Sequence, residues 1–170
     1  MHTTIKPAAL PFSSAKTYLA AAAFVVGNII LPQLFHLVPQ GGVTWLPIYF
    51  FTLVGACVFG WRVGLITAIA SPVVNSLLFG MPAAAVLPAI LIKSVLLAVL
   101  AGVVAERTRL SIPVLAAVVL GYQALGTLGE WALCGNFALA CQDFRIGLPG
   151  MLMQVFAGYA VIRYWTNKSN

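Results

Sequence analysis

Charged side chains are scarce in this sequence. Of its 170 residues, 7% are Asp, Glu, Lys or Arg, and only 3 are acidic. An ordinary soluble domain has about 25% charged residues and is about half apolar, whereas 62% of this chain is hydrophobic. A chain with so few charges cannot cover its surface with groups that water solvates. It is therefore an integral membrane protein, and no polar stretch is long enough to build a second, soluble domain.

The sequence also lacks the motifs on which most enzymes depend. It has no His-Glu-x-x-His, no Gly-x-Ser-x-Gly and no glycine-rich phosphate loop ending in Lys. Its 3 cysteines, Cys57, Cys134 and Cys141, do not have the spacing of a metal site. Free thiols are expected, although Cys134 and Cys141 could meet in a disulfide outside the membrane. An intramembrane enzyme is thus the least supported hypothesis, no cofactor or metal is expected, and any ATP-driven step requires another chain.

The sequence instead contains long runs of residues without a charged side chain. A helix needs about 20 apolar residues to cross a hydrocarbon layer of about 30 Å. Residues 17–61 carry no charge but contain Pro39-Gln40-Gly41-Gly42, which favours a turn, so this run predicts two helices. The expected fold is one all-α transmembrane domain over residues 1–170. Its six helices are predicted over residues 17–37, 45–60, 63–80, 84–105, 111–134 and 147–165.

The positions of the cations predict how the bundle is oriented. They are few and lie between apolar runs, so the bias toward positive cytoplasmic loops explains the net charge of +6 better than nucleic-acid binding does. With the N-terminus inside, Arg145 is the only cation in an outer segment. The cytoplasmic segments hold Lys6, Lys16, Arg62, Arg107, Arg109, Arg163 and Lys168. Both termini are therefore expected in the cytoplasm.

A few polar residues interrupt the predicted helices and are the candidate site residues. They are Asn28, Asn75, Lys93, Gln123, Glu130 and Gln154. An ionisable group at membrane depth is costly and should face the bundle interior. Gln123 and Glu130 share one face of their helix, and together with Lys93 and Gln154 they can converge in the outer half of the bundle. Asn75 and Trp131 are expected near the mouth of such a pocket.

Two interpretations of Lys93 stay open. It could form a structural ion pair with Glu130 that only fixes the register of two helices. Alternatively, Lys93 meets an anionic or carbonyl group of a ligand, while Glu130, Gln123 and Gln154 supply hydrogen bonds. In the second case we expect an anionic vitamin, such as pantothenate or a folate-like compound, and Lys93→Met should nearly abolish its binding.

Short motifs rich in Gly, Pro and Trp follow the predicted helices. They are Trp45-Leu46-Pro47, Gly60-Trp61-Arg62-Val63-Gly64, Ser71-Pro72, Leu78-Phe79-Gly80-Met81-Pro82, Leu87-Pro88, Ala101-Gly102 and Gly147-Leu148-Pro149-Gly150. Their order and spacing over residues 45–160 resemble those of the substrate-binding S components of energy-coupling factor (ECF) vitamin transporters.

The resemblance implies a six-helix S component in the cytoplasmic membrane of a bacterium or archaeon. Such subunits capture a vitamin or a related small molecule from outside and then associate with a membrane coupling subunit and two cytoplasmic ATPases. The coupling contact of the family, a pair of small residues on the first helix, is matched loosely by Ala23 and Gly27 or by Thr17 and Ala21. Similar proteins commonly have an acidic residue near the position of Lys93, so the vitamin of a relative does not transfer to this chain.

A structural membrane protein is the alternative hypothesis. The rod-shape-determining membrane subunit has a bundle similar to that of an S component but binds proteins, and such a role would make Lys93 and Glu130 purely structural. Neighbouring genes for ATPases and a vitamin pathway would favour transport, whereas genes for cell-wall synthesis would favour the alternative.

Overall fold

The computed structural model describes residues 9–169, and the regular elements of this part of the chain are all helices, as predicted. The longer helices are α1 (Ala15–Phe35), α3 (Phe50–Phe59), α4 (Trp61–Phe79), α5 (Leu87–Arg107), α6 (Ile112–Cys134) and α9 (Leu148–Ser169). Short elements fill the connections: α2 (Gly41–Trp45), the 3-10 helix η1 (Pro47–Tyr49), α7 (Phe137–Ala140) and α8 (Gln142–Ile146).

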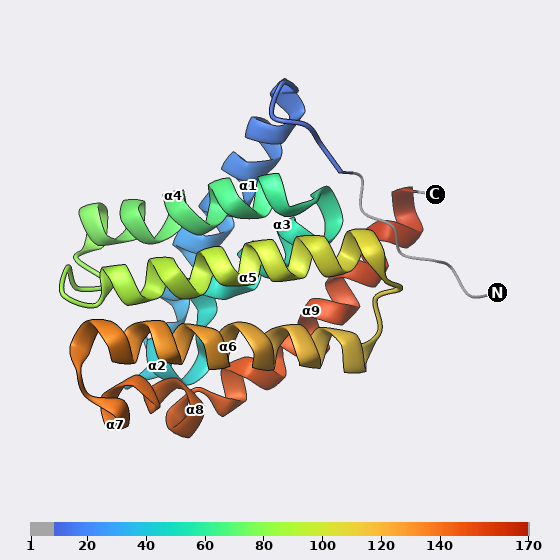
Figure 1. The fold of residues 1–170 in the computed structure, drawn as a ribbon. Helices are drawn as coiled ribbons and strands as arrows, with labels where there is room; N and C mark the ends of the chain where they lie inside the picture. Colours follow the sequence, from blue (N-terminus) through green and yellow to red (C-terminus); the bar gives the residue numbers. More distant parts are fainter. Residues whose placement is uncertain (1–8, 170) are drawn as a thin grey trace.

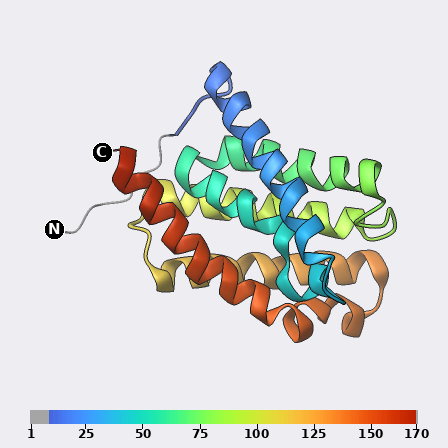
Figure 2. The same cartoon turned by 180° about the vertical axis from the view of Figure 1, so that it is seen from behind.

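The helices form two layers around a central helix. Helices α4, α5 and α6 lie side by side in chain order, and α1 and α9 cross them at a steep angle on the other side (Figure 1, Figure 2). Between the layers, α3 packs against α1, α4, α5 and α9. Its sequence is apolar on every side, and most of its residues are buried, which is the pattern of a helix enclosed by other helices.

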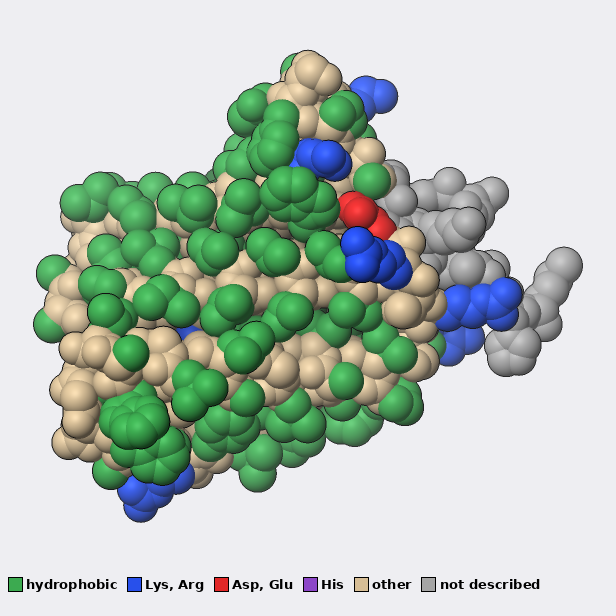
Figure 3. Space-filling view, viewed as in Figure 1, with side chains coloured by type: hydrophobic (Ala, Val, Ile, Leu, Met, Phe, Trp, Pro, Cys, Tyr) green, Lys and Arg blue, Asp and Glu red, His purple; other side chains and the backbone are tan. Residues whose placement is uncertain are grey.

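Four helices, α1, α4, α5 and α6, are long and apolar enough to cross a membrane by length and composition. Their outward surface is apolar too: Leu19 on α1 is 75% exposed and Leu77 on α4 is 80% exposed. Hydrophobic side chains cover the face formed by α4, α5 and α6 (Figure 3). Because water does not tolerate so large an apolar surface, the chain is a multi-pass membrane protein.

The helix boundaries depart from the predictions mainly at α3. The residues predicted as one helix, 45–60, are split because Leu46 adopts a left-handed conformation, with φ +48°, and Pro47 then begins η1. The other predicted boundaries lie within four residues of the observed ones. Residues 135–146, predicted as a loop, contain the short helices α7 and α8.

The two ends of the bundle differ in how many cationic side chains they carry on the surface. Most of the Lys and Arg surface visible in Figure 3 lies toward the end where α9 finishes, and little of it lies toward the opposite end, beside the short helices. Arg107 ends α5 at the first of these ends, whereas Arg145 lies on α8 at the second. Lys6, which the sequence analysis placed with the cytoplasmic cations, lies outside the described residues.

A buried polar cluster links α1, α3 and α4. The Asn28 amide group donates to the hydroxyls of Thr52 (3.0 Å) and Ser71 (3.1 Å). Pro32 lacks an N–H, so the Asn28 carbonyl has no donor from the next helical turn. The Asn75 amide group donates to that carbonyl instead, at 2.9 Å. The cluster thereby satisfies a backbone acceptor that the α1 proline leaves without its helical partner.

Candidate functional site

Among the described Lys and Arg residues, Lys93 is the one that is buried inside the bundle. It is only 2% exposed and lies six residues after the start of α5 at Leu87, about 9 Å along the helix axis. This is closer to the helix end than the sequence indicated, because α5 begins three residues later than predicted. Lys93 therefore lies near the end of the bundle that carries α2, α7 and α8 (Figure 1).

Two carboxylates from different helices bind the Lys93 ammonium. Its Nζ atom donates to Glu130 Oε2 on α6 and to Asp143 Oδ2 on α8, at 2.6 Å in each case. Charge-assisted hydrogen bonds of this length are strong, and they offset part of the cost of burying the cation. The structure thus brings together the Lys93 and Glu130 that the sequence analysis selected.

Asp143 is not among the predicted site residues, because residues 135–146 are predicted to form a loop. In the structure this segment folds back over the end of the bundle, and α8 places Asp143 against α5. A signal was available: Asp143 is one of only 3 acidic residues in the chain, and Lys93 requires an anionic partner in an apolar environment.

A pocket of about 430 Å³ opens beside this ion triad of Lys93, Glu130 and Asp143. Its size is typical of sites for small molecules. The wall comes from the end of α1, the segment from α2 to η1, the connection between α4 and α5, and the triad itself. The lining side chains are mostly apolar and include Val38, Val43, Leu46, Ile48, Val86 and Ile90.

The polar part of the pocket wall is anionic. The Lys93 side chain is 3% exposed, whereas those of Glu130 and Asp143 are 18% and 17% exposed. The two carboxylates are therefore more accessible than the ammonium that binds them. Two anions and one cation leave a net charge of −1 at the wall when His36, which also lines the pocket, is neutral. Tyr49 lines the pocket while only 2% exposed, and its hydroxyl has no hydrogen bond to the described residues.

The rim of the pocket contains unusual backbone. Gln40 and Leu46 flank α2 with φ +57° and +48°, a left-handed region that residues other than glycine rarely adopt, and both line the pocket. Such conformations persist where the surrounding structure holds them in place. Here the end of α2 packs tightly on the start of α9, since a Cβ atom on Gly150 would overlap the Trp45 backbone. Two motifs about a hundred residues apart in the sequence, Trp45-Leu46-Pro47 and Gly147-Leu148-Pro149-Gly150, therefore meet beside the pocket.

A glycine of α6 makes room for the Lys93 side chain. A Cβ atom on Gly126 would overlap Lys93 Cγ, so any larger residue there has to displace the lysine stem. Gly126 lies one helical turn before Glu130, and the bare backbone at this point lets α5 and α6 approach closely. The spacing of Gly126 and Glu130 thus sets the position of the triad.

Gln123 and Gln154, two of the predicted site residues, are buried but do not line the pocket. Gln154 Oε1 accepts a hydrogen bond from the Tyr122 hydroxyl at 2.9 Å. Gln154 Nε2 and both amide atoms of Gln123 are buried without a hydrogen-bond partner among the described residues. The Tyr122 ring packs on the Tyr49 ring, with centroids 5.6 Å apart, so Tyr122 and Tyr49 connect Gln154 to the pocket wall.

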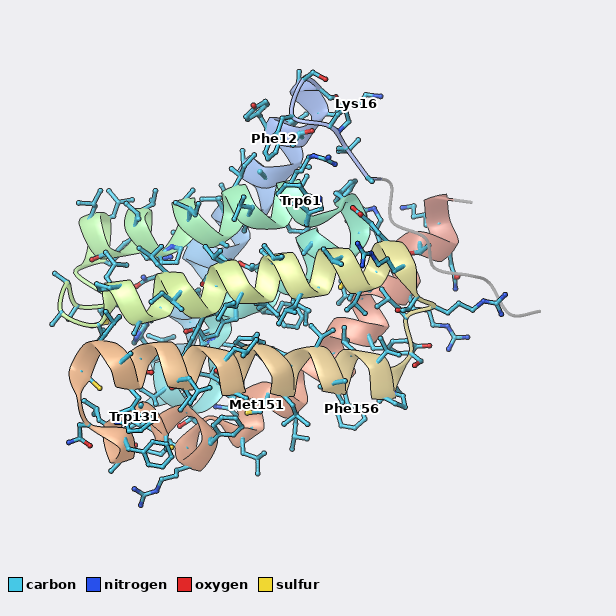
Figure 4. All side chains as sticks on the ribbon, in the orientation of Figure 1. Phe12, Lys16, Trp61, Trp131, Met151 and Phe156 are labelled. Atoms are coloured by element: carbon cyan, nitrogen blue, oxygen red, sulfur yellow. The ribbon has the colours of Figure 1, made fainter. Side chains whose placement is uncertain are left out.

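Asn75 and Trp131, expected near the pocket mouth, also lie elsewhere. Asn75 belongs to the buried cluster around Asn28, because its amide group is used to repair the break that Pro32 makes in α1. Trp131 is 45% exposed and packs edge-on against Phe137 of α7, with ring centroids 5.3 Å apart (Figure 4). Its exposed place near the end of α6 is typical of an aromatic residue at a membrane interface.

The two predicted coupling residues differ in their surroundings. Ala23 is exposed on α1. Gly27, one turn later, faces α3, and a Cβ atom there would lie 2.8 Å from Phe51 Cδ2. A larger side chain at position 27 would therefore disturb the packing of α1 on α3, whereas Ala23 can be enlarged without such a change.

The three cysteines are free thiols, with Cys57 buried and Cys134 exposed. Within residues 9–169, no group of three His, Cys, Asp or Glu side chains could hold a metal ion. No protein-family model matches the chain, and no curated protein or solved structure shows significant similarity to it.

Proposed function

We propose that this chain is the substrate-capture S component of an ATP-driven ECF-type uptake transporter. In this proposal it binds a vitamin or a related small molecule from outside a bacterial or archaeal cytoplasmic membrane. A membrane coupling subunit and two cytoplasmic ATPases would supply the energy, because the sequence carries no phosphate-binding motif of its own.

The pocket beside the ion triad is the observation that carries this proposal. Ionisable groups inside a membrane protein are expensive and mark ligand or ion sites by default. A structural ion pair between two helices needs no cavity, whereas here Glu130 and Asp143 border one of about 430 Å³. A mostly apolar pocket with a few convergent polar groups is the usual form of a small-molecule site.

The distribution of cations supports an outward-facing pocket. Arg107 ends α5 and Arg109 follows it at the end remote from the triad, whereas Arg145 lies at the triad's end on α8. Since short cytoplasmic loops are enriched in Lys and Arg, we place the pocket outside and both chain termini in the cytoplasm. In this topology α1, α3, α4, α5, α6 and α9 make six passages.

The passage through η1 and α3 is the shortest of the six. The apolar stretch Pro47–Phe59 is shorter than a full span, but neighbouring helices enclose it, so it does not have to match the lipid thickness. Irregular backbone at membrane depth is tolerated where it is buried in protein or lines a water-filled cavity. The left-handed turn at Leu46 lines the pocket, which is consistent with a solvent-accessible site at this level.

Affinity purification of the full chain from its native membrane tests the proposal against the structural alternative. Co-purification of a coupling subunit with two ATPases, together with ATP-dependent uptake of a small molecule by the reconstituted complex, is the expected result. Isolation with cell-wall synthesis proteins, and no ATPase, would replace the proposal by the structural role.

Ala23 offers a way to separate coupling from capture. Because Ala23 is exposed on α1, Ala23→Trp should weaken association with the coupling subunit and lower uptake while small-molecule binding is retained. Leu120→Trp, at an exposed position of another helix, α6, is the matched control. Equal uptake in Ala23→Trp and the unmodified chain would place the coupling contact on another surface.

A further inference from the structure

We propose that the pocket selects a ligand with a protonated or permanently cationic nitrogen, which binds against Glu130 and Asp143. This inference rests on the proposed function and adds to it the charge class of the substrate. It replaces the anionic ligand expected from the sequence, because the structure adds a second carboxylate to the site.

The charge of the pocket wall is the first argument. Three Lys, Arg, Asp or Glu residues line the pocket: Lys93, Glu130 and Asp143. Their one positive and two negative charges give the wall a net charge of −1. Arg145 is exposed and does not line the pocket; it lines a neighbouring hollow with Asn136, so it is not part of the charge of the pocket wall. In a partly desolvated pocket an unbalanced charge attracts a ligand of opposite sign and repels one of the same sign.

The arrangement inside the triad is the second argument. The ammonium of Lys93 is already held by two carboxylates at 2.6 Å. A ligand anion would have to displace one of them and leave a carboxylate unpaired in the wall, which is strongly unfavourable. A cationic nitrogen can instead bind the carboxylate oxygens that face the pocket, since an ionised carboxylate has about four acceptor sites and Lys93 uses one oxygen of each.

The other residues of the pocket wall indicate the chemistry of the rest of the ligand. Apolar side chains such as Val43, Ile48 and Ile90 line most of the pocket, so the body of the ligand is apolar or aromatic. The Tyr49 hydroxyl has no hydrogen bond to the described residues although the residue is only 2% exposed. Because Tyr49 lines the pocket, a polar atom of the ligand near its cationic group can hydrogen-bond to this hydroxyl. Lys93 is a positioning residue in this scheme, since it holds the carboxylates rather than the ligand.

Three fragments of nearly identical shape measure the charge preference directly. Benzamidinium is cationic, benzamide is neutral and benzoate is anionic. Their dissociation constants for the full chain in lipid nanodiscs can be measured by ligand-observed NMR at millimolar concentrations. Benzamidinium should bind at least about ten-fold more tightly than benzoate, a difference of about 1.4 kcal/mol, with benzamide between them.

Isosteric variants show whether the two carboxylates cause the preference for a cationic fragment. Asp143→Asn and Glu130→Gln should each reduce the ratio of benzoate to benzamidinium dissociation constants by at least about ten-fold. Benzamide binding should change little, which shows that the pocket is intact. Arg145→Gln is the control and should leave the ratio as in the unmodified chain.

The inference is overturned if benzoate binds as tightly as benzamidinium, if benzamidinium does not bind at millimolar concentration, or if its preference survives both carboxylate variants. Failure of the proposed function is a separate result. If the pocket prefers cations but the chain purifies with cell-wall proteins, only the proposed transport role is wrong. If the complex takes up an anion with ATP, only the proposed charge of the ligand is wrong.

Discussion

The Lys93 ammonium lies 2.6 Å from the Asp143 carboxylate, although 50 positions separate the two residues in the sequence. Asp143 belongs to a five-residue helix, α8, in the connection between α6 and α9. Its bond to Lys93 holds this connection against α5 and closes one side of the pocket. One ion pair thus joins the end of the helix bundle to the segment that covers it.

Removal of Lys93 should be more damaging than removal of either partner. Lys93→Met leaves Glu130 and Asp143 as two unpaired anions beside the site of the lost cation, and a broken buried pair costs about 3–5 kcal/mol. Asp143→Asn leaves Lys93 paired with Glu130, so a smaller loss is expected, about 1–2 kcal/mol. Reversible unfolding in mixed micelles measures both values.

The matched control for this comparison removes all three charges. The triple variant Lys93→Met, Glu130→Gln and Asp143→Asn should recover part of the stability lost in Lys93→Met, because no unpaired carboxylate remains. Equal free energies of unfolding for Lys93→Met and Asp143→Asn would contradict the triad as described.

The sequence was sufficient for those parts of the fold that depend on local composition. Charge-free runs predicted the long helices, since an apolar helix of this length is stable wherever lipid or other helices cover it. The split before α3 was not predicted, because it depends on the left-handed Leu46. The Leu46 side chain packs against Gly147, and the neighbouring Trp45 backbone packs against Gly150 in α9. Tertiary contacts of this kind leave no local pattern in the chain.

Prediction of the site was limited for the same reason. Lys93 and Glu130 were found because a charge inside an apolar helix is conspicuous. Asp143 was missed because it follows the end of a helix, where a charge is unremarkable. Gln123 and Gln154 are buried, as predicted. However, the Tyr49 and Tyr122 rings lie between Gln154 and the pocket, so Gln154 does not line it. Residue spacing along the helices does not predict this arrangement.

Gly126 and Gly121 on α6 should respond in opposite ways to the same substitution. A methyl group on Gly126 overlaps the Lys93 stem, whereas one on Gly121 comes no closer than 3.9 Å to Leu100. Gly126→Ala should cost about 1–3 kcal/mol through overpacking. Gly121→Ala should be neutral or stabilising by up to about 1 kcal/mol, since alanine is the better helix former. Unfolding free energies measure both, and equal effects would show that the close approach at Lys93 is not a constraint.

Asn75 should matter less when α1 has no proline. Its amide group donates to the Asn28 carbonyl that Pro32 leaves without a helical donor, so Asn75→Ala should cost about 1–2 kcal/mol. In a Pro32→Ala background the N–H of residue 32 can bond that carbonyl, and the same substitution should cost less. A double-mutant cycle gives the coupling; a coupling of zero would show that Asn75 does not replace the missing donor.

Cys134 reports the orientation of the bundle. It is exposed at the end of α6 near the pocket, whereas Cys57 is buried in α3. A membrane-impermeant maleimide should label Cys134 in intact cells of a Cys141→Ser variant, because an accessible thiol reacts far faster than a buried one. The further replacement Cys134→Ser should abolish the labelling. Labelling of Cys134 only after the membrane is permeabilised would reverse the orientation.

The amount of small molecule that the purified protein carries tests the central claim, capture in the pocket beside the triad, most directly. Val86 lines the pocket and is 46% exposed, whereas Leu77 is 80% exposed and does not line it, so Val86→Trp fills the pocket and Leu77→Trp is its control. After purification from the native membrane and denaturation, mass spectrometry should detect about one molecule of the same compound per chain from the unmodified protein and from Leu77→Trp. Val86→Trp should release almost none. Absence of any compound from the unmodified protein, or undiminished release from Val86→Trp, would contradict the account.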